Sequence, residues 1–428
     1  MIRVSRSFKL KDVSSFKKKL FKWSANSDIS VFLNSNNYES DIGEYDAILA
    51  IGLHSKTQFT KQNSLTKLDD YINQTKDWVF GYLSYDLKNE LEKLNSKNID
   101  SFFLPNLFFF QPKKIWLVSK HSVEALYLDG SLIQDDWIEI NETSPFYNFS
   151  KSNKIKLKKR LNKNQYKNNI CLLLDHINRG DVYEANYCME WFSENSVIIP
   201  EEVYLKLNEI STTPMSAYFK NKNLYLLSSS PERYIKRIND RIVSQPIKGT
   251  SRRDQNNLID SKLMKELELN VKERSENIMI VDLIRNDLSR FSIPGSVKVN
   301  ELCKVYPFKQ VHQMISTVES KVQSNLSFAE IIKSTFPMGS MTGAPKVRAM
   351  TIIENLEVST RGLYSGALGY IKPTGDFDFN VVIRSLIYDS DTKYLSFHVG
   401  SAITSKSEIL KEYDECLLKA KAMISVLK

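Results

Sequence analysis

The sequence predicts an α+β fold, because strand-like and helix-like segments are mixed along its 428 residues without strict βαβ alternation. In residues 1–140, short apolar runs alternate with turns rich in Asn, Ser and Lys, a rhythm typical of antiparallel strands. Examples of these runs are SVFLNS (30–35), YDAILAIG (45–52), WVFGYLSYDL (78–87) and KKIWLVSK (113–120). From Tyr166 the apolar residues take helical spacing instead, so helices join the strands in the later part of the chain.

The first expected element of that later part is a helix over 166–177, whose apolar residues share one face and which Gly180 ends. In the segment SQPIKGTSRR we expect a strand that ends near Ile247, followed by a turn at Lys248–Thr250. The other regular segments expected are a strand over 182–192, paired strands over 223–235 and 241–247, an amphipathic helix over 255–281 and a final helix over 409–427.

Three stretches of different composition suggest the organisation of the chain. Residues 1–140 are strand-rich, residues 141–165 form a connecting segment rich in Asn, Ser and Lys, and residues 166–428 carry the motifs described below. We expect the first and third stretches to pack into one two-lobed unit.

The composition argues against a membrane or secreted protein. No apolar run approaches the roughly 18 residues that span a bilayer, and the basic N-terminus lacks the apolar core of a signal peptide. The cysteines show no metal or redox spacing, so we expect reduced thiols and a cytoplasmic location; they are Cys171, Cys188, Cys303 and Cys416. The net charge of +9 comes from dispersed lysines without a nucleic-acid-binding motif, so we expect no nucleic-acid partner, although this charge also suits an anionic small substrate.

Two helical segments each carry a pair of glutamates three residues apart. In KERSEN the pair is Glu273 and Glu276, and in KEYDECLLK it is Glu412 and Glu415, with Lys419 one turn further on the same stripe. Four carboxylates from two segments could surround a hard divalent cation such as Mg²⁺, which prefers oxygen ligands. Taken alone, each pair also fits an ordinary solvated helix face.

Several single residues are further candidates. Arg384 stands in the apolar strand-like run FNVVIRSL and needs a carboxylate or an anion as partner, while Tyr364 in RGLYSGALGYI offers a hydroxyl. Gly400 in FHVGSAIT offers backbone N–H groups, and His312 has polar neighbours that fit a structural role equally well. Lys248 in QPIKGT is either a solvated residue or an amine held against a substrate.

Taken together, the motifs resemble those of the chorismate-utilising enzymes, the family of anthranilate synthase component I. The matching motifs, in order, are SSSPERYI, QPIKGTSRR, ERSENIMIVDLIRNDLSR, FPMGSMTGAPKVRAM, RGLYSGALGYI, FNVVIRSL and KEYDECLLKAKAM. The resemblance covers residues 165–428 and extends to WVFGYLSYDLKNELEKL (78–94), which is similar to the aminodeoxychorismate synthases of this family. It implies the anthranilate synthase component I-like fold, in which antiparallel β-sheets form a sandwich flanked by helices, with a chorismate-binding catalytic region over 166–428.

The resemblance also implies roles for the glutamates as ligands of a Mg²⁺ cofactor. Glu276 and Glu415 correspond to the principal ligands, and Glu273 and Glu412 to the supporting ones. In the family the metal holds the ring carboxylate of chorismate and fixes the ring.

Other roles implied by the resemblance concern the organic part of the site. Tyr364 and Arg384 correspond to the clamp on the enolpyruvyl carboxylate, which the Gly400 backbone and Lys419 assist. Glu232 corresponds to the general acid that protonates the departing 4-hydroxyl. His312 and Ser340 would lie beside the reacting face of the ring and are expected to position and polarise it.

A lysine in the P-I-K-G-T segment is the mark of the aminodeoxychorismate synthases. In anthranilate synthases the matching segment resembles P-I-A-G-T. The resemblance therefore implies that Lys248 attacks carbon 2 of chorismate, after which ammonia adds at carbon 4 and expels the lysine. A neutral amine is needed for this attack, so we expect a pocket that lowers the pKa of Lys248.

Two positions depart from the family pattern. Glu184 stands where the isochorismate and salicylate synthases carry a lysine that activates water, and where many ammonia-using members have glutamine. Ala402 replaces a glycine in the segment after Gly400, which makes the backbone there less permissive.

The resemblance implies partners as well. No G-x-C-x-G nucleophile turn of a glutaminase occurs, so ammonia is expected from a separate glutamine amidotransferase subunit. Tryptophan binds in the N-terminal region of many relatives, and SVFLNSNN (30–37) lies about where that motif falls. Two alternatives stay open: an anthranilate synthase component I whose segment happens to carry lysine, and a catalytically silent, basic binding protein.

Overall fold

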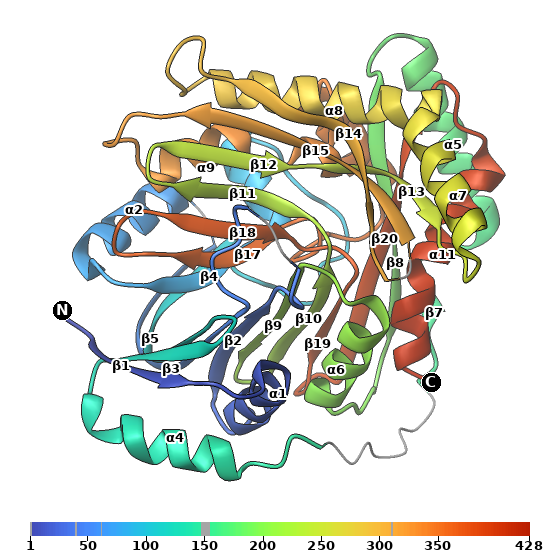
Figure 1. Ribbon diagram of the computed structural model, residues 1–428. Helices are drawn as coiled ribbons and strands as arrows, with labels where there is room; N and C mark the ends of the chain where they lie inside the picture. The colour runs from blue at the N-terminus through green and yellow to red at the C-terminus, as the bar shows by residue number, and fades with distance from the viewer. Residues whose placement is uncertain (1, 39–40, 61, 147–154, 310) are drawn as a thin grey trace.

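Two antiparallel β-sheets share the long strands β3 (Ala47–Phe59) and β5 (Leu107–Val118) of the computed structural model, which describes residues 2–38, 41–60, 62–146, 155–309 and 311–428 (Figure 1). The first half of β3 pairs with the second half of β5 and belongs to the first sheet. The register shifts between Leu53 and Ser55, and beyond this shift the same two strands continue into the second sheet. A bulge of this kind bends a strand, which allows one strand pair to serve both sheets.

The first sheet contains the edge strand β1, most of the early strands and the last strand of the chain. Its order is β1 (Val4–Lys9), β6 (Ser122–Tyr127), β5, β3, β2 (Ile29–Asn34), β9 (Met215–Asn221), β10 (Leu224–Ser230), β19 (Ser385–Asp389), β20 (Tyr394–Thr404) and β8 (Glu184–Ser193), with the short strands β7 (Lys158–Lys159) and β16 (Gly343–Ala344) on β8.

The second sheet carries most of the motifs. Its order is β5, β4 (Val79–Leu83), β17 (Ala367–Ile371), β18 (Phe377–Val381), β11 (Arg233–Ile238), β12 (Arg241–Gln245), β15 (Val311–Lys321) and β14 (Lys298–Pro307), and β13 (Ile247–Arg252) also pairs with β15. Among the described residues, every pair of strands is antiparallel, and the isolated bridge between Ile99 and Ser359 is parallel.

The two sheets pack face to face. Tyr82 of the second sheet meets Phe219 of the first edge-on at 5.5 Å between ring centroids, and Phe108 contacts both rings. Alternation of side chains along each strand places these apolar residues on the inner faces, where their burial from water holds the sandwich together.

Helices cover both outer faces of the sandwich. The helices around the first sheet are α1 (Val13–Ser24), α4 (Ile133–Glu142), α5 (Lys163–Asn178), α6 (Pro200–Ser211), α10 (Lys346–Leu356) and α11 (Ile409–Val426). Those on the second sheet are α2 (Ser64–Thr75), α7 (Asn257–Leu269), α8 (Val271–Ser289) and α9 (Phe328–Thr335), and α8 runs along the outside of β14 and β15 (Figure 1). The shorter helical turns are α3 (Lys88–Leu91), η1 (Tyr85–Leu87), η2 (Gly130–Leu132) and η3 (Gly339–Met341). The predicted α+β class, with antiparallel sheets in a helix-flanked sandwich, is confirmed.

The N-terminal residues and the later part of the chain contribute strands to both sheets. In the first sheet β2 pairs with β9, and in the second β4 pairs with β17. Helix α4 extends to Glu142 and α5 begins at Lys163; within the predicted connecting segment, residues 147–154 lie outside the described residues. None of the helices in the described ranges carries an apolar stretch long enough to cross a membrane.

The predicted helix over 255–281 is wrong in one respect, because two helices replace it. Asn270 ends α7 and begins α8, and its side chain accepts a hydrogen bond from the backbone N–H of Glu273. Asparagine is a strong helix N-cap, so a single side chain divides the amphipathic pattern and sets the direction of α8.

Candidate active site

The PIKGT segment (Pro246–Thr250) lies in a bulged strand, and the predicted turn at Lys248–Thr250 is therefore wrong. Pro246 separates β12 from β13, and the pairing of β13 with β15 shifts between Ile247 and Thr250. Gly249 has a φ of +93°, and a Cβ on it would lie 3.2 Å from side-chain atoms of Glu273 and from Met314. A glycine is needed at this point, since the backbone is left-handed and passes close to α8.

The Lys248 side chain points into the protein and pairs with Glu184 at the start of β8. Its Nζ donates a hydrogen bond to Glu184 Oε1 at 2.8 Å, with the lysine side chain 10% exposed and the glutamate fully buried. Glu184 Oε2 has no hydrogen-bond partner among the described residues. Of the two interpretations of Lys248, the solvated surface residue is thereby excluded.

The expectation that the pocket lowers the pKa of Lys248 is wrong for this arrangement. Burial lowers the pKa, but the carboxylates of Glu184, Glu276 and Glu232 raise it more, and the net direction is upward. Three negative charges around one amine outweigh the cost of burying its charge.

The structure brings together Glu232, the predicted general acid, and Ser340, which was predicted to lie beside the ring. The Ser340 hydroxyl, in η3, donates to Glu232 Oε1 at 2.7 Å, and both residues are buried. Burial raises the pKa of Glu232 to about 7, against the lowering effect of the Ser340 hydrogen bond and of the Lys248 and Lys419 charges. A carboxylic acid with such a pKa can hold and release a proton near neutral pH.

The two glutamate pairs lie on α8 and α11, and each pair shares a helix face as expected. Glu276 and Glu412 are buried, and Glu276 Oε1 has no hydrogen-bond partner in the described part of the chain. Burial raises the pKa of Glu276 to about 7, and it raises the pKa of Glu273, on which the charge of Glu415 also acts. The charges on the two helices thus act on a common region.

Glu415 and Lys419 form an ion pair one turn apart on α11. Lys419 Nζ lies 2.6 Å from Glu415 Oε1 and donates to the Gly400 carbonyl at 2.9 Å. Burial would raise the pKa of Glu415, but Lys419 outweighs it and the pKa is lowered. Lys419 and Gly400, both expected to assist the carboxylate clamp, are thus hydrogen-bonded to each other, through the Gly400 carbonyl in strand β20.

The sequence did not single out Lys272, in the first turn of α8. Its Nζ lies 3.4 Å from Glu412 Oε1 and 3.7 Å from Glu276 Oε1, so an ammonium stands between two of the predicted metal ligands. The spacing of Lys272 and Glu276, one helical turn apart, is the sequence signal that could have indicated it.

The described residues contain no ready-made metal centre, since no three His, Cys, Asp or Glu side chains are grouped closely enough to hold an ion. The donor chemistry nevertheless fits Mg²⁺: the helix faces offer carboxylate oxygens, and one of them, Glu276 Oε1, is buried without a hydrogen bond. Because Mg²⁺ keeps several waters and binds through one or two carboxylates, a closed protein cage is not required.

Arg384 lies in a bend between β18 and β19, and the expectation that a strand carries it is wrong. Its φ is +52°, and β18 ends at Val381. The guanidinium makes no hydrogen bond or ion pair with any side chain in the described residues, and burial lowers its pKa. A half-buried arginine without a carboxylate partner is suited to an anionic ligand.

Tyr364 lies in the turn before β17, which covers only the second half of RGLYSGALGYI. Its ring stacks on His398 at 5.2 Å, and its hydroxyl lies 3.8 Å from the Cys188 Sγ. A Cβ on Gly400 would lie 2.6 Å from the same Sγ. Cys188 therefore fills the space between two of the predicted substrate-binding positions.

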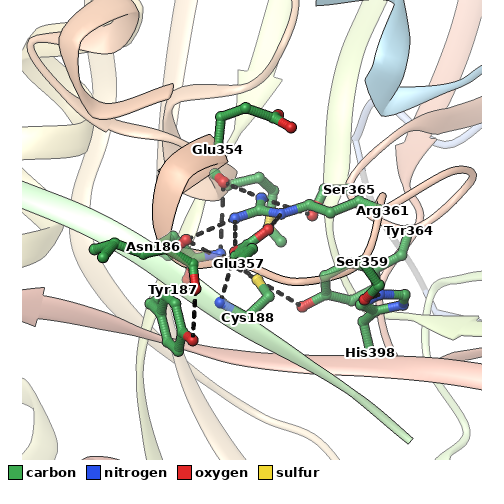
Figure 2. Close-up of polar contacts among 12 residues, drawn as sticks. Asn186, Tyr187, Cys188, Glu354, Glu357, Ser359, Arg361, Tyr364, Ser365 and His398 are labelled. Atoms are coloured by element: carbon green, nitrogen blue, oxygen red, sulfur yellow. Dashed lines mark hydrogen bonds and ion pairs between the residues drawn. The ribbon is translucent and has the colours of Figure 1, made fainter. Parts of the chain in front are cut away.

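A buried network around Arg361 holds this part of the site (Figure 2). The guanidinium makes two bonds to Glu357, at 2.7 and 3.0 Å, and donates to the carbonyls of Met341 and Asn186, each at 2.7 Å. Glu357 Oε1 in turn accepts from the Cys188 N–H at 2.8 Å. The network links β8, η3 next to Ser340 and the turn that carries Tyr364.

His312 contacts a carboxylate that is not among the predicted metal ligands. It is buried on β15, and its Nε2 lies 3.0 Å from Asp260 of α7, which also pairs with Arg253. His312 Nδ1 has no hydrogen-bond partner among the described residues. Its proposed role beside the ring stays a prediction, while its observed contact anchors α7 to the sheet.

A separate cavity of about 1060 Å³ lies between residues of the first 140 positions and residues of the later part of the chain. It is lined by the end of β2 at Leu33–Ser35, by Pro214 and Met215 before and in β9, and by strands of the second sheet. None of the twelve predicted site residues lines it. The segment in which tryptophan binding was considered thus borders a large cavity away from Lys248.

Comparison with known proteins agrees with the motifs. The model of the chorismate binding enzyme family matches residues 29–425. A probable aminodeoxychorismate synthase from rice is 39% identical over 269 residues, 62% of this chain and 30% of that longer protein. Aminodeoxychorismate synthase component 1 of Escherichia coli is 32% identical over 352 residues, covering 82% of this chain and 77% of that protein.

The crystal structure of anthranilate synthase component I from Streptococcus pneumoniae has the same fold. It superposes with a TM-score of 0.79 at 23% identity, covering 90% of this chain and 93% of that one. With the match over almost the whole length and the shared fold, this chain belongs to the chorismate binding enzyme family.

Proposed function

We propose that this chain is the synthase subunit of an aminodeoxychorismate synthase, which converts chorismate and ammonia to 4-amino-4-deoxychorismate and water. The observation that carries the proposal is the position of Lys248: its amine is buried beside Glu184 and acts on the pKa of Glu232. An amine held there faces the same space as the acid that the reaction needs.

The two carboxylates of chorismate have two different sets of candidate partners. Arg384, which lacks a protein partner in the described residues, and the Tyr364 hydroxyl suit the enolpyruvyl carboxylate. Mg²⁺ held by Glu276 and Glu415, with Glu273 and Glu412 in support, would neutralise and fix the ring carboxylate.

The side chains then have defined proton tasks. Glu184 Oε1, which accepts the hydrogen bond of Lys248, takes a proton from the ammonium and leaves a neutral amine. The amine bonds to carbon 2, the two ring double bonds shift, and the 4-hydroxyl leaves as water with the proton of Glu232. Ammonia adds at carbon 4, the double bonds shift back, and the bond from Lys248 to carbon 2 breaks.

A separate glutamine amidotransferase subunit is proposed as the source of ammonia, which agrees with the name "component 1" of the Escherichia coli relative. We also propose the cavity at Leu33–Ser35 as the place where tryptophan would bind, because it is large and offers both apolar and polar groups.

The test is the identity of the product. The purified chain is incubated with chorismate, Mg²⁺ and ammonium, and the products are separated and identified by mass spectrometry. We expect aminodeoxychorismate without release of pyruvate. Anthranilate with an equal amount of pyruvate would instead identify an anthranilate synthase, and the absence of turnover would favour a binding protein.

A further inference from the structure

The Lys272 ammonium lies between Glu276, a predicted principal metal ligand, and Glu412, a predicted supporting one. It lies 3.4 Å from Glu412 Oε1 on α11 and 3.7 Å from Glu276 Oε1 on α8, between two carboxylates that come from distant parts of the sequence. Glu276 is 8% exposed, and its Oε1 has no hydrogen bond within the described ranges. The gap therefore contains a buried oxygen aimed at a cation but not hydrogen-bonded to it.

The Lys272 side chain is held only loosely in this gap. It is 40% exposed, and within the described residues its contacts are these two carboxylates. Lys248 differs, because it is 10% exposed and its hydrogen bond is 2.8 Å long, against 3.4 Å for the one from Lys272 to Glu412. Lys272 has a flexible four-carbon stem and an open side toward solvent, so its ammonium can leave without disturbing a packed core.

We propose that Lys272 is a built-in placeholder cation: it balances Glu276 and Glu412 while no divalent ion is bound, and its ammonium moves out to solvent when Mg²⁺ enters. The inference rests on the proposed function, because it assumes that Mg²⁺ binds between α8 and α11. An ammonium and a divalent ion cannot share the space between the same two carboxylates, since like charges at this distance repel. Lys272 thus keeps the empty site from repelling itself and lowers its affinity for metal.

The placeholder role predicts an unusual effect of mutation on the affinity for Mg²⁺. Removing a residue from a binding site normally weakens binding, but removing the Lys272 charge should strengthen the binding of Mg²⁺. We expect Lys272→Met, which keeps most of the stem, to bind Mg²⁺ about tenfold more tightly than the parent in the absence of chorismate.

The experiment is isothermal titration calorimetry of MgCl₂ into the full chain, with Mn²⁺ and electron paramagnetic resonance as a second readout. Lys262→Met is the matched control, because Lys262 pairs with Glu266 one helical turn away on the exposed face of α7 and lies outside the site. Its affinity for Mg²⁺ should equal that of the parent. Lys272→Gln is the second variant, should the methionine variant fail to fold by circular dichroism.

Glu276→Gln separates failure of this inference from failure of the proposed function. If the parent binds Mg²⁺ and Glu276→Gln weakens the binding, the metal lies at these glutamates. In that case, equal or weaker binding by both Lys272 variants overturns the placeholder role. If Glu276→Gln binds as the parent does, or the parent binds no Mg²⁺, the proposed metal site itself is wrong and the placeholder role falls with it.

Discussion

The Arg361 network and the Lys248 region are two buried assemblies of cations and glutamates, and they differ in how completely their charged groups are paired. Around Arg361 the guanidinium bonds to Glu357, Met341, Asn186 and the Ser365 hydroxyl, and its plane lies 4.5 Å from the Tyr85 ring centroid.

Around Lys248, by contrast, two carboxylate oxygens lack hydrogen-bond partners within the described residues. These are Glu184 Oε2 and Glu276 Oε1. Beside Arg361, the Tyr85 hydroxyl and His398 Nδ1 also lack hydrogen bonds within the described residues, but the two atoms beside Lys248 belong to carboxylates. A buried carboxylate oxygen without a partner is costly, so this arrangement needs a reason. The comparison teaches that the first assembly maintains the shape of the site, whereas the open carboxylate oxygens of the second agree with our proposal that a metal and a substrate bind there.

Replacing Lys248 should have the largest effect and tests whether the unpaired region does the chemistry. We expect Lys248→Ala to lower kcat with ammonium by at least about 10³-fold, because the covalent route is lost. The measurement is a steady-state assay of product by mass spectrometry. Lys236→Ala is the control: this buried lysine donates to the Ile42 carbonyl and pairs with Asp378, and its loss should leave kcat near the parent value. A Lys248 variant as fast as the parent would refute the nucleophile role.

Replacing Arg361 tests the paired assembly. Arg361→Gln leaves Glu357 buried without its counter-charge, and we expect the free energy of unfolding in denaturant to fall by about 3 to 5 kcal/mol. Arg237→Gln is a matched change, because Arg237 is a buried arginine that donates to three backbone carbonyls and leaves no carboxylate behind. Its loss should be smaller, about 1 to 3 kcal/mol. Equal losses of unfolding free energy in the two variants would show that the ion pair with Glu357 adds nothing beyond ordinary hydrogen bonds.

Neutralising Glu276 should raise the free energy of unfolding, whereas replacing Arg361 should lower it. The opposite signs sharpen the comparison of the two assemblies. Its pKa is raised to about 7 by burial, so the stability that this carboxyl contributes is fully present at low pH and is lost as the pH rises through about 7. At pH 8 in EDTA, Glu276→Gln should therefore raise the free energy of unfolding by about 1 to 3 kcal/mol. At pH 4, below the ordinary glutamate pKa of 4.5, the difference should disappear, and a loss of stability at pH 8 would contradict the assignment of Glu276 to the unpaired region.

The smallest expected effect concerns the acid. Glu232 must be protonated to donate, and its pKa is raised to about 7, so kcat should fall as the pH rises above about 7. The hydrogen bond from Ser340 lowers this pKa, and Ser340→Ala should move the alkaline limb of the pH profile upward by about one unit. Ser359→Ala, which removes a buried hydroxyl next to His398, should leave the limb in place. An unmoved limb in the Ser340 variant would argue against Glu232 as the acid.

Much of the scaffold could be predicted from the sequence, because it depends on local patterns. The strand-rich first 140 residues, the buried face of α5 and the paired glutamates on α8 and α11 all follow from spacing within one element. The two helices could be assigned to a common site only through the order of the motifs.

Features that depend on contacts between distant segments could not be predicted. The bulge at Gly249 arises from pairing with β15, about 65 residues away, and the positive φ of Arg384 from a bend that its apolar neighbours do not reveal. The raised pKa of Lys248 depends on Glu184 being fully buried at 2.8 Å, and the place of Lys272 depends on a glutamate 140 residues later. In each case the sequence shows which residue stands at the position, but it does not show which distant residue lies beside it in the fold.

The pairing of β4 with β17 means that the first 140 residues serve the later part as a cover for exposed backbone. A shortened protein that began at residue 166 would leave one side of β17 and one side of β9 with open rows of N–H and C=O groups. Such edges attract strands from other molecules, so this fragment would aggregate, however complete its set of catalytic motifs.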